Sequence, residues 1–221
     1  MSPAETVALL AFAFVATHFL LSHPLRQPLA RRLGERGFSA AYSAVALATF
    51  VPMVLARRSA GPEAPLWNAS EAGWIAAALL VWLGSILFVG SFRRNPAMVN
   101  ASGKPVTIGE PAGVFHITRH PMMWGFALWA VAHIVVNPEP SALAIAAAIL
   151  ILALGGAAGQ DRKKQKQIGE QWLTWQQRTS FVPFGHGLAG PGWFALIGGS
   201  VLFLAATWAH PFSIGVWRWF A

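Results

Sequence analysis

An ionisable cluster lies at the start of one of the long apolar stretches of this sequence. Arg119 and His120 come directly before Pro121, which opens the apolar run, and a second imidazole, His133, lies inside that run. Histidine changes protonation near neutral pH and is a common metal ligand. Ionisable side chains at membrane depth are costly and mark functional sites by default. We therefore predict Arg119 and His120 as candidate catalytic residues.

Each residue of this cluster has more than one possible role. His120 is a candidate metal ligand, a candidate proton donor, or an ordered residue beside Pro121, since proline is favoured in the first turn of a helix. Arg119 can anchor a phosphate or a lipid head group. Asp161 is placed to form an ion pair with Arg119 across the cytoplasmic mouth of the helices. The chain has no cysteine, so thiolate chemistry is excluded and histidine is the strongest metal ligand left.

The elements that must position these residues are membrane helices. Of the 221 residues, 55% are apolar and only 11% are charged, against roughly 25% charged in an average soluble domain. The charges are also segregated, which leaves six stretches able to hold a span of about 20 apolar residues. We predict an all-α polytopic transmembrane bundle, one domain over residues 1–221, with about six spans. The predicted spans are 4–22, 39–56, 72–92, 122–137, 141–159 and 193–210.

The distribution of basic residues predicts the orientation of the bundle. The connections 23–38, 93–121 and 160–192 each carry a net charge of +3. By the positive-inside rule these three connections are cytoplasmic, so both termini face outward. The pair Arg57 and Arg58 departs from this rule, because it lies on the outer side. A basic face that binds anionic membrane lipid explains the net charge of +8, and we predict no nucleic-acid partner.

The cytoplasmic segment after the fifth span contains apolar residues at helical spacing. Ile168, Trp172 and Trp175 fall on one face if residues 161–177 are helical. We therefore expect a separate short amphipathic helix from Asp161 to Gln177, lying at the membrane interface. The last ten residues, which include Trp217 and Arg218, are too short to cross and are expected to form a second interfacial anchor.

Several short motifs, taken together in this order and spacing, resemble the NnrU family. The resemblance covers nearly the whole chain and implies an integral protein of the bacterial inner membrane with a link to nitrogen-oxide metabolism and denitrification. The motifs are Thr17-His18, Leu33-Gly34-Glu35-Arg36-Gly37, Thr118-Arg119-His120-Pro121-Met122-Met123-Trp124-Gly125, Ala132-His133 and Ala209-His210-Pro211.

The NnrU family is in turn similar to the plant zeta-carotene isomerases, which use haem b with two axial histidines. The matching positions in this chain are His18 and His133, and Ala130 stands where the isomerases have a cysteine. The resemblance thus implies haem b held by His18 and His133. On physical grounds, the cationic residues Arg26 and Arg119 are candidates to meet the propionates near the cytoplasmic surface, and aromatic residues such as Trp129 are candidates to line the ring. The resemblance also implies redox or isomerase-like chemistry on a small or lipophilic ligand, such as nitric oxide or a polyene.

The depth of the two histidines argues against this pairing. His18 lies four residues from the cytoplasmic end of the first span, whereas the fourth span runs in the opposite direction and carries His133 near its outer end. At about 1.5 Å per residue the two differ in height by more than about 10 Å. Pairings that involve His23, His120 or His210 therefore stay open.

Two other functions compete with the haem protein. The Arg-His-Pro motif also resembles the isoprenylcysteine and phospholipid methyltransferase superfamily, as do Ile168-Gly169-Glu170-Gln171-Trp172 and Val182-Pro183-Phe184. That resemblance implies S-adenosylmethionine as the cofactor. Asp161 is the acid nearest to the position of the glutamate pair of those enzymes, and a single acid is a poor match. A non-catalytic membrane accessory factor is the third possibility.

Overall fold

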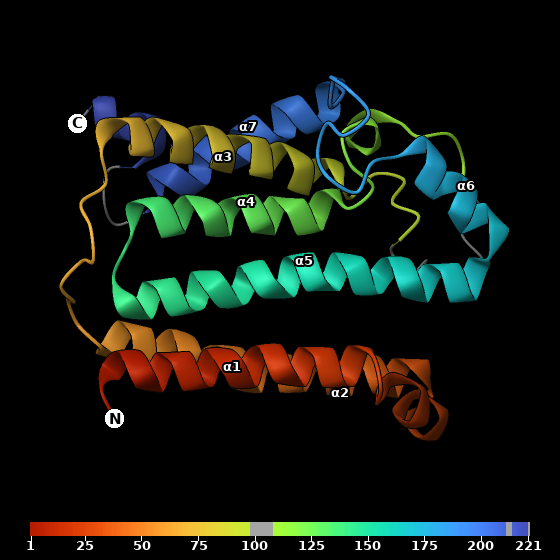
Figure 1. The fold of residues 1–221 in the computed structure, drawn as a ribbon, viewed down its shortest axis with the longest axis horizontal. Coiled ribbons are helices and arrows are strands. Elements are labelled where there is room, and N and C mark those ends of the chain that lie inside the picture. The colour runs from red at the N-terminus through yellow and green to blue at the C-terminus, as the bar shows by residue number, and fades with distance from the viewer. Residues whose placement is uncertain (98–107, 211–213, 221) are drawn as a thin grey trace. The chain divides into compact units, whose positions relative to one another are not determined.

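The structure is a computed structural model that describes residues 1–97, 108–210 and 214–220 (Figure 1). These residues form helices and connections, with no strand among them. Lys104 of the second basic connection and Pro211 of the last motif lie outside the described residues. The elements in chain order are α1 (Pro3–Ser22), α2 (Arg26–Ser59), α3 (Glu71–Gly90), η1 (Gly113–His116), α4 (Pro121–Val136), α5 (Pro140–Ile168), α6 (Glu170–Arg178), α7 (Trp193–Trp208) and η2 (Gly215–Trp219).

Six of these helices cover the six predicted spans, although α2 begins 13 residues before its predicted span and α5 continues nine residues beyond its own. By length and composition, α1, α2, α3 and α5 are able to cross a membrane. The other two apolar helices, α4 and α7, have 16 residues each. At 1.5 Å per residue they extend about 24 Å, slightly less than the roughly 30 Å of a bilayer core. The prediction of an all-α membrane protein is confirmed, whereas its orientation stays a prediction from the charges.

The chain forms two compact units, each built from two separate stretches. Unit 1 contains Met1–Gly73 and His133–Leu152, and unit 2 contains Trp74–Ala132 and Ala153–Ala221. The boundaries fall inside α3, α4 and α5. The predicted haem ligands His18 and His133 are both in unit 1, whereas Arg119, His120 and Asp161 are all in unit 2.

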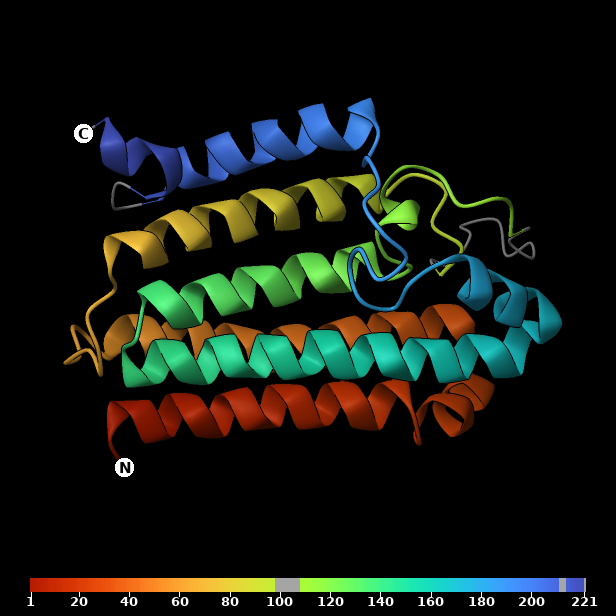
Figure 2. The same cartoon turned by 45° about the horizontal axis from the view of Figure 1, so that its top comes forward.

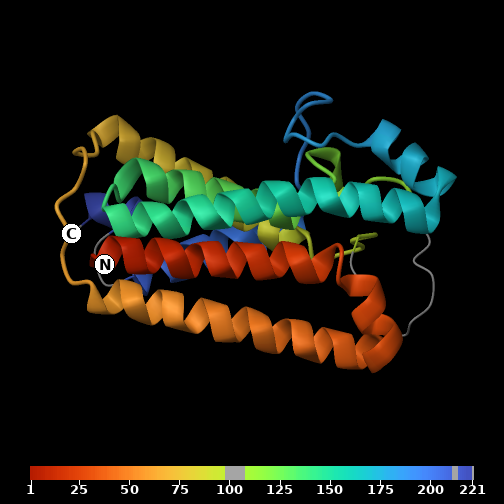
Figure 3. The same cartoon turned by 60° about the horizontal axis from the view of Figure 1, so that its bottom comes forward.

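In unit 1, α1 and α2 lie side by side as an antiparallel pair (Figure 3). Their apolar contact is centred on Val7, Phe14 and Met53, which pack with Ala148 of α5. At the C-terminal end of α2, Arg57 forms an ion pair with Glu139. This pairing offsets one of the two positive charges that departed from the positive-inside rule, because Arg57 is partly neutralised within the protein.

In unit 2, α3 lies between α4 and α7 (Figure 2). Both neighbours approach the α3 backbone through glycine. A Cβ atom at Gly199 of α7 would lie 2.4 Å from the Cα atom of Ile86, and one at Gly125 of α4 would lie 2.9 Å from the carbonyl oxygen of Gly84. Small residues let membrane helices pack closely in this way.

The predicted amphipathic helix over 161–177 is wrong in its bounds and in its surroundings. Helix α5 continues through the charged residues to Ile168, and Gly169, with φ of 65°, breaks the chain before the short α6. The indoles of Trp172 and Trp175 are buried against η1, where Trp175 contacts Phe115. The apolar face of α6 therefore packs into unit 2 rather than facing lipid.

Candidate functional site

The Arg-His-Pro motif lies where the chain enters α4. Pro121 is the first residue of α4, so His120 and Arg119 directly precede the helix. The His120 side chain is fully buried, and the Arg119 side chain is 12% exposed. Burial of this degree requires partners for both groups, because an unpaired buried charge is strongly unfavourable.

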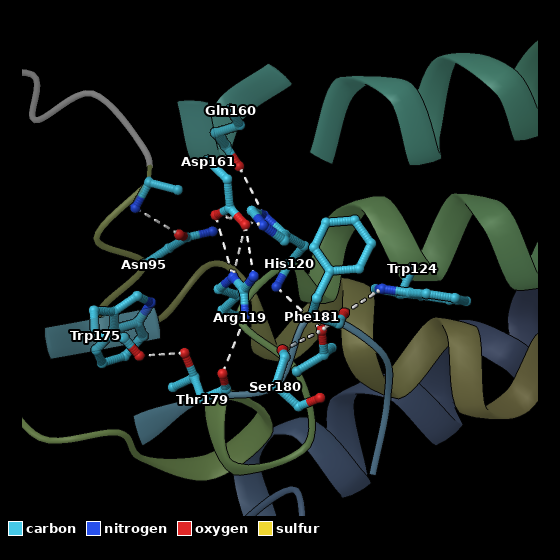
Figure 4. A network of polar contacts seen from close by, with 12 residues as sticks. Asn95, Arg119, His120, Trp124, Gln160, Asp161, Trp175, Thr179, Ser180 and Phe181 are labelled. Atoms are coloured by element: carbon cyan, nitrogen blue, oxygen red, sulfur yellow. Dashed lines mark hydrogen bonds and ion pairs between the residues drawn. The ribbon is translucent and has the colours of Figure 1, made fainter. Parts of the chain in front are cut away.

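Asp161 of α5 supplies the main partner for both residues (Figure 4). The Nη2 atom of Arg119 donates to Oδ2 of Asp161 at 2.7 Å, and Nε donates to both carboxylate oxygens, at 2.9 Å to Oδ2 and 3.2 Å to Oδ1. Nε2 of His120 lies 2.9 Å from Oδ1. Two-pronged guanidinium–carboxylate pairs of this kind are among the strongest hydrogen bonds in proteins. The predicted ion pair between Arg119 and Asp161 is confirmed.

The second ring nitrogen of His120 also has a partner. Its Nδ1 atom lies 3.1 Å from Oε1 of Gln160, the residue before Asp161. The T-shaped contact with the Phe181 ring, at 5.2 Å between centroids, covers one side of the imidazole. Both nitrogens of His120 are therefore engaged by the protein, and neither is left to bind iron or to exchange a proton with a substrate in this arrangement.

Residues 179–184 close the cluster from the other side (Figure 4). Their carbonyl oxygens accept from the motif in three places: Thr179 from Nη1 of Arg119 at 3.0 Å, Ser180 from the Arg119 amide at 2.8 Å, and Phe181 from the Trp124 indole at 2.7 Å. The guanidinium of Arg119 also stacks over the Phe181 ring. The 179–184 segment is thus held to the start of α4 by hydrogen bonds on consecutive carbonyl groups.

Sequence reasoning missed three contributors to this cluster. Gln160 is adjacent to Asp161, and its polarity at the end of an apolar run was the available signal. The hydroxyl of Thr118, which donates to the Phe181 carbonyl at 2.8 Å, belongs to the motif already identified. The carbonyl groups of residues 179–181 carried no signal, because a backbone acceptor looks the same at every position.

The predicted haem ligand His18 has a different environment, in unit 1. Its Nδ1 atom lies 2.8 Å from the carbonyl oxygen of Phe14, so Nδ1 carries the proton and the Nε2 lone pair is the acceptor. Its ring packs between Phe14, at 4.3 Å, and Tyr42, at 5.3 Å between centroids. Metal-bound histidines almost always donate their other ring N–H in this way. His18 taken alone therefore fits a ligand role.

The structure does not bring His133 to His18. His18 packs against Tyr42, and the fifteen residues from Tyr42 to Arg57 extend about 22 Å along α2. At that far end Arg57 pairs with Glu139, which follows α4 closely, and His133 is in the last turn of α4. Imidazole nitrogens lie roughly 2 Å from a bound metal, so two trans ligands are about 4 Å apart. This pair does not fit one haem.

The other predicted cofactor contacts, Arg26 and Trp129, belong to different units. Arg26 forms an ion pair with Glu35 at 2.9 Å and stacks over the Phe38 ring. Trp129 is 36% exposed on the part of α4 that belongs to unit 2. His23 lies five residues after His18, with Nδ1 at 2.8 Å from the Ser22 hydroxyl. Among the described residues, no group of three or more His, Asp or Glu side chains could hold a metal ion.

Comparison with known proteins identifies relatives along nearly the whole chain. The profile of the NnrU protein family matches residues 6–218. A 15-cis-zeta-carotene isomerase from the chloroplast of Arabidopsis thaliana is 28% identical over 83% of this chain and 50% of its own length. The Zea mays protein of the same name is 27% identical over 92% of this chain and 59% of its own length. The chain thus spans about half the length of the Arabidopsis relative, and no solved structure matches it significantly.

Proposed function

Because the chain belongs to the NnrU family, we propose that it is an isomerase-like enzyme that acts on a lipophilic polyene inside a bacterial inner membrane. One observation carries this proposal: the match to two proteins named 15-cis-zeta-carotene isomerase extends over 83% and 92% of this chain. The match includes the membrane helices, so an apolar substrate has access from the bilayer.

The chemistry of isomerisation suits the polar groups of this chain. Turning a cis double bond into a trans one changes no atom count and needs neither a nucleophile nor a hydrolytic water. It requires only a temporary loss of double-bond order. Within the part of the chain that the structure describes, the buried groups of the motif bind one another. Arg119, His120 and Asp161 then act by positioning the start of α4 against α5 and the 179–184 segment.

The methyltransferase alternative gains no support from the motif. Its best candidate acid, Asp161, accepts hydrogen bonds from both Arg119 and His120. A carboxylate held in this way has little capacity left for the amino group of S-adenosylmethionine. A non-catalytic accessory factor is distinguished from the proposed isomerase by one measurement, because it would not convert a substrate.

Haem b and a link to nitrogen oxides stay predictions from the resemblance. Haem b, when bound, supplies a redox centre beside an apolar substrate. His18 has the tautomer of a ligand, but the pair formed with His133 does not fit, so no step of the proposed reaction is derived through haem. A reduced-minus-oxidised absorption spectrum of the purified protein tests haem directly, and nitric oxide added to the reduced sample tests the second prediction.

The proposed activity is tested with the full chain in proteoliposomes. We expect 15-cis-zeta-carotene, incubated with the protein in the dark, to be converted to the isomer with a trans 15 bond, measured by chromatography. Boiled protein and empty vesicles control for thermal isomerisation. Equal rates with and without active protein, under reducing and oxidising conditions and with haem supplied during expression, would contradict the proposal and favour the accessory factor.

A further inference from the structure

The first helical turns of α2 form an arm that differs from the rest of that helix. At Gly34 the backbone leaves helical geometry, with φ of 70° and ψ of 165°. The segment before this break turns away from the axis of the rest of α2 (Figure 3). We call residues 25–37 the basic arm. It connects the end of α1 to the apolar part of α2, so the two spans hold it at the membrane surface.

The basic arm carries positive charge that the protein does not neutralise. Arg31, Arg32 and Arg36 are all exposed. Glu35 is the only acid in the arm, and it pairs with Arg26. Within the described ranges, no hydrogen bond or ion pair involves any of the three exposed arginines. The arm therefore presents a net charge of about +3 to its surroundings, of the size that anionic lipid surfaces attract.

Exposed apolar side chains accompany these charges. Leu25 is 41% exposed and Leu33 is 50% exposed, and Leu33 lies next to Arg32 in sequence. Leucine beside arginine on a short helix is typical of segments that lie in the interface plane, with the apolar side chains inserted and the charged ones among head groups. Arginine in particular matches the geometry of phosphate oxygens. A soluble acidic partner would explain the charges but not the leucines.

We propose that the basic arm is a docking site for anionic phospholipid head groups of the cytoplasmic leaflet, such as phosphatidylglycerol. Arg31, Arg32 and Arg36 contact the phosphates, while Leu25 and Leu33 insert between the acyl chains. Gly34 supplies the break that lets the arm leave the axis of α2. A Cβ atom at this position would meet no atom within 4 Å, so only the positive φ favours glycine there.

Native mass spectrometry of the full chain in detergent, titrated with short-chain phosphatidylglycerol or phosphatidylcholine, tests this site. We expect phosphatidylglycerol to bind more tightly, and the triple variant R31Q/R32Q/R36Q to lose about tenfold or more of that affinity. Affinity for phosphatidylcholine should not change. The triple lysine variant should keep most of the preference, because it keeps the charge.

Two controls make the result specific. Arg58→Gln removes an exposed arginine from the opposite end of the same helix and should leave binding unchanged. Leu33→Gln should weaken phosphatidylglycerol but not inorganic phosphate, which distinguishes a lipid from a free anion. The proposal fails if the triple glutamine variant binds phosphatidylglycerol like the parent protein. It also fails if Arg58→Gln has the same effect, or if inorganic phosphate competes as well as the lipid does.

Discussion

The two histidine sites of this protein differ in what their surroundings leave free. In unit 2, His120 has an oxygen at each ring nitrogen and lies against a carboxylate that also holds Arg119. In unit 1, one ring nitrogen of His18 donates to a backbone carbonyl, and the ring packs against the aromatic rings of Phe14 and Tyr42. The first site is built to hold parts of the chain together. The second has a donor atom that is compatible with a ligand.

The largest effect should come from removing the shared carboxylate of the unit 2 site. Asp161→Ala leaves Arg119 and His120 buried without their counter-charge, and breaking a buried pair in this way costs about 3–5 kcal/mol. Thermal unfolding in detergent should show a large loss of stability. Glu110→Ala removes an exposed partner of Arg178 and should cost little. Equal losses of stability for the two variants would show that the buried contacts of Asp161 stabilise the fold no more than an exposed ion pair does.

A smaller effect is expected from the contact that holds the 179–184 segment. Trp124→Phe keeps a large ring but removes the indole N–H that donates to the Phe181 carbonyl. We expect a loss of about 1 kcal/mol in the free energy of unfolding, together with faster proteolysis within residues 179–184. Trp193→Phe changes a 77% exposed side chain and is the matched control. Unchanged proteolysis would mean that the segment is held by other contacts.

The spans and the ion pair were predictable from the sequence because they depend on composition. A charge-free stretch of membrane length identifies a helix wherever it packs, and Asp161 was the acid expected across the cytoplasmic mouth of the helices from Arg119. Hydropathy failed at the end of α5, because it measures transfer into lipid and not helix formation. Residues 162–167 are polar but good helix formers, so the helix ends at the glycine rather than at the membrane surface.

Two features could not be predicted from the sequence in this way: which histidines pair as haem ligands, and which groups hold the Arg-His-Pro motif. The resemblance implied His18 with His133, whereas the depth of the two histidines argued against that pair, and unit 1 places them at different heights along α2. The hydrogen bonds from Trp124 and Arg119 end on carbonyl groups, whose positions depend on how residues 179–184 fold. The side-chain types of these residues do not determine where their carbonyl groups lie.

Substitution of His18 in unit 1 should change the absorption spectrum of the protein more than its free energy of unfolding. If the protein binds haem, His18→Ala should abolish or shift the reduced-minus-oxidised spectrum, because it removes the Nε2 donor. His133→Ala should leave the spectrum unchanged, since His133 does not reach His18. His186→Ala serves as the control. A spectrum lost in both His18→Ala and His133→Ala would restore the pairing that the resemblance implies and contradict the arrangement in unit 1.

The smallest effect concerns Glu63, a carboxylate in the connection between α2 and α3. Glu63 accepts hydrogen bonds from the hydroxyl and the amide of Ser141, at the start of α5. The hydrogen bond from the Ser141 side chain, with the charge of Arg57, holds the pKa of Glu63 below its usual value of 4.5. Because the pKa is lower in the folded state, ionised Glu63 stabilises the fold at pH values above its pKa in the unfolded chain. This contribution is lost as the pH falls through its pKa in the folded protein.

Glu63→Gln should therefore unfold at a lower temperature than the parent protein at pH 7, and the difference should shrink on acidification. A difference that is constant with pH would mean that Glu63 acts through its shape rather than its charge, unlike Asp161.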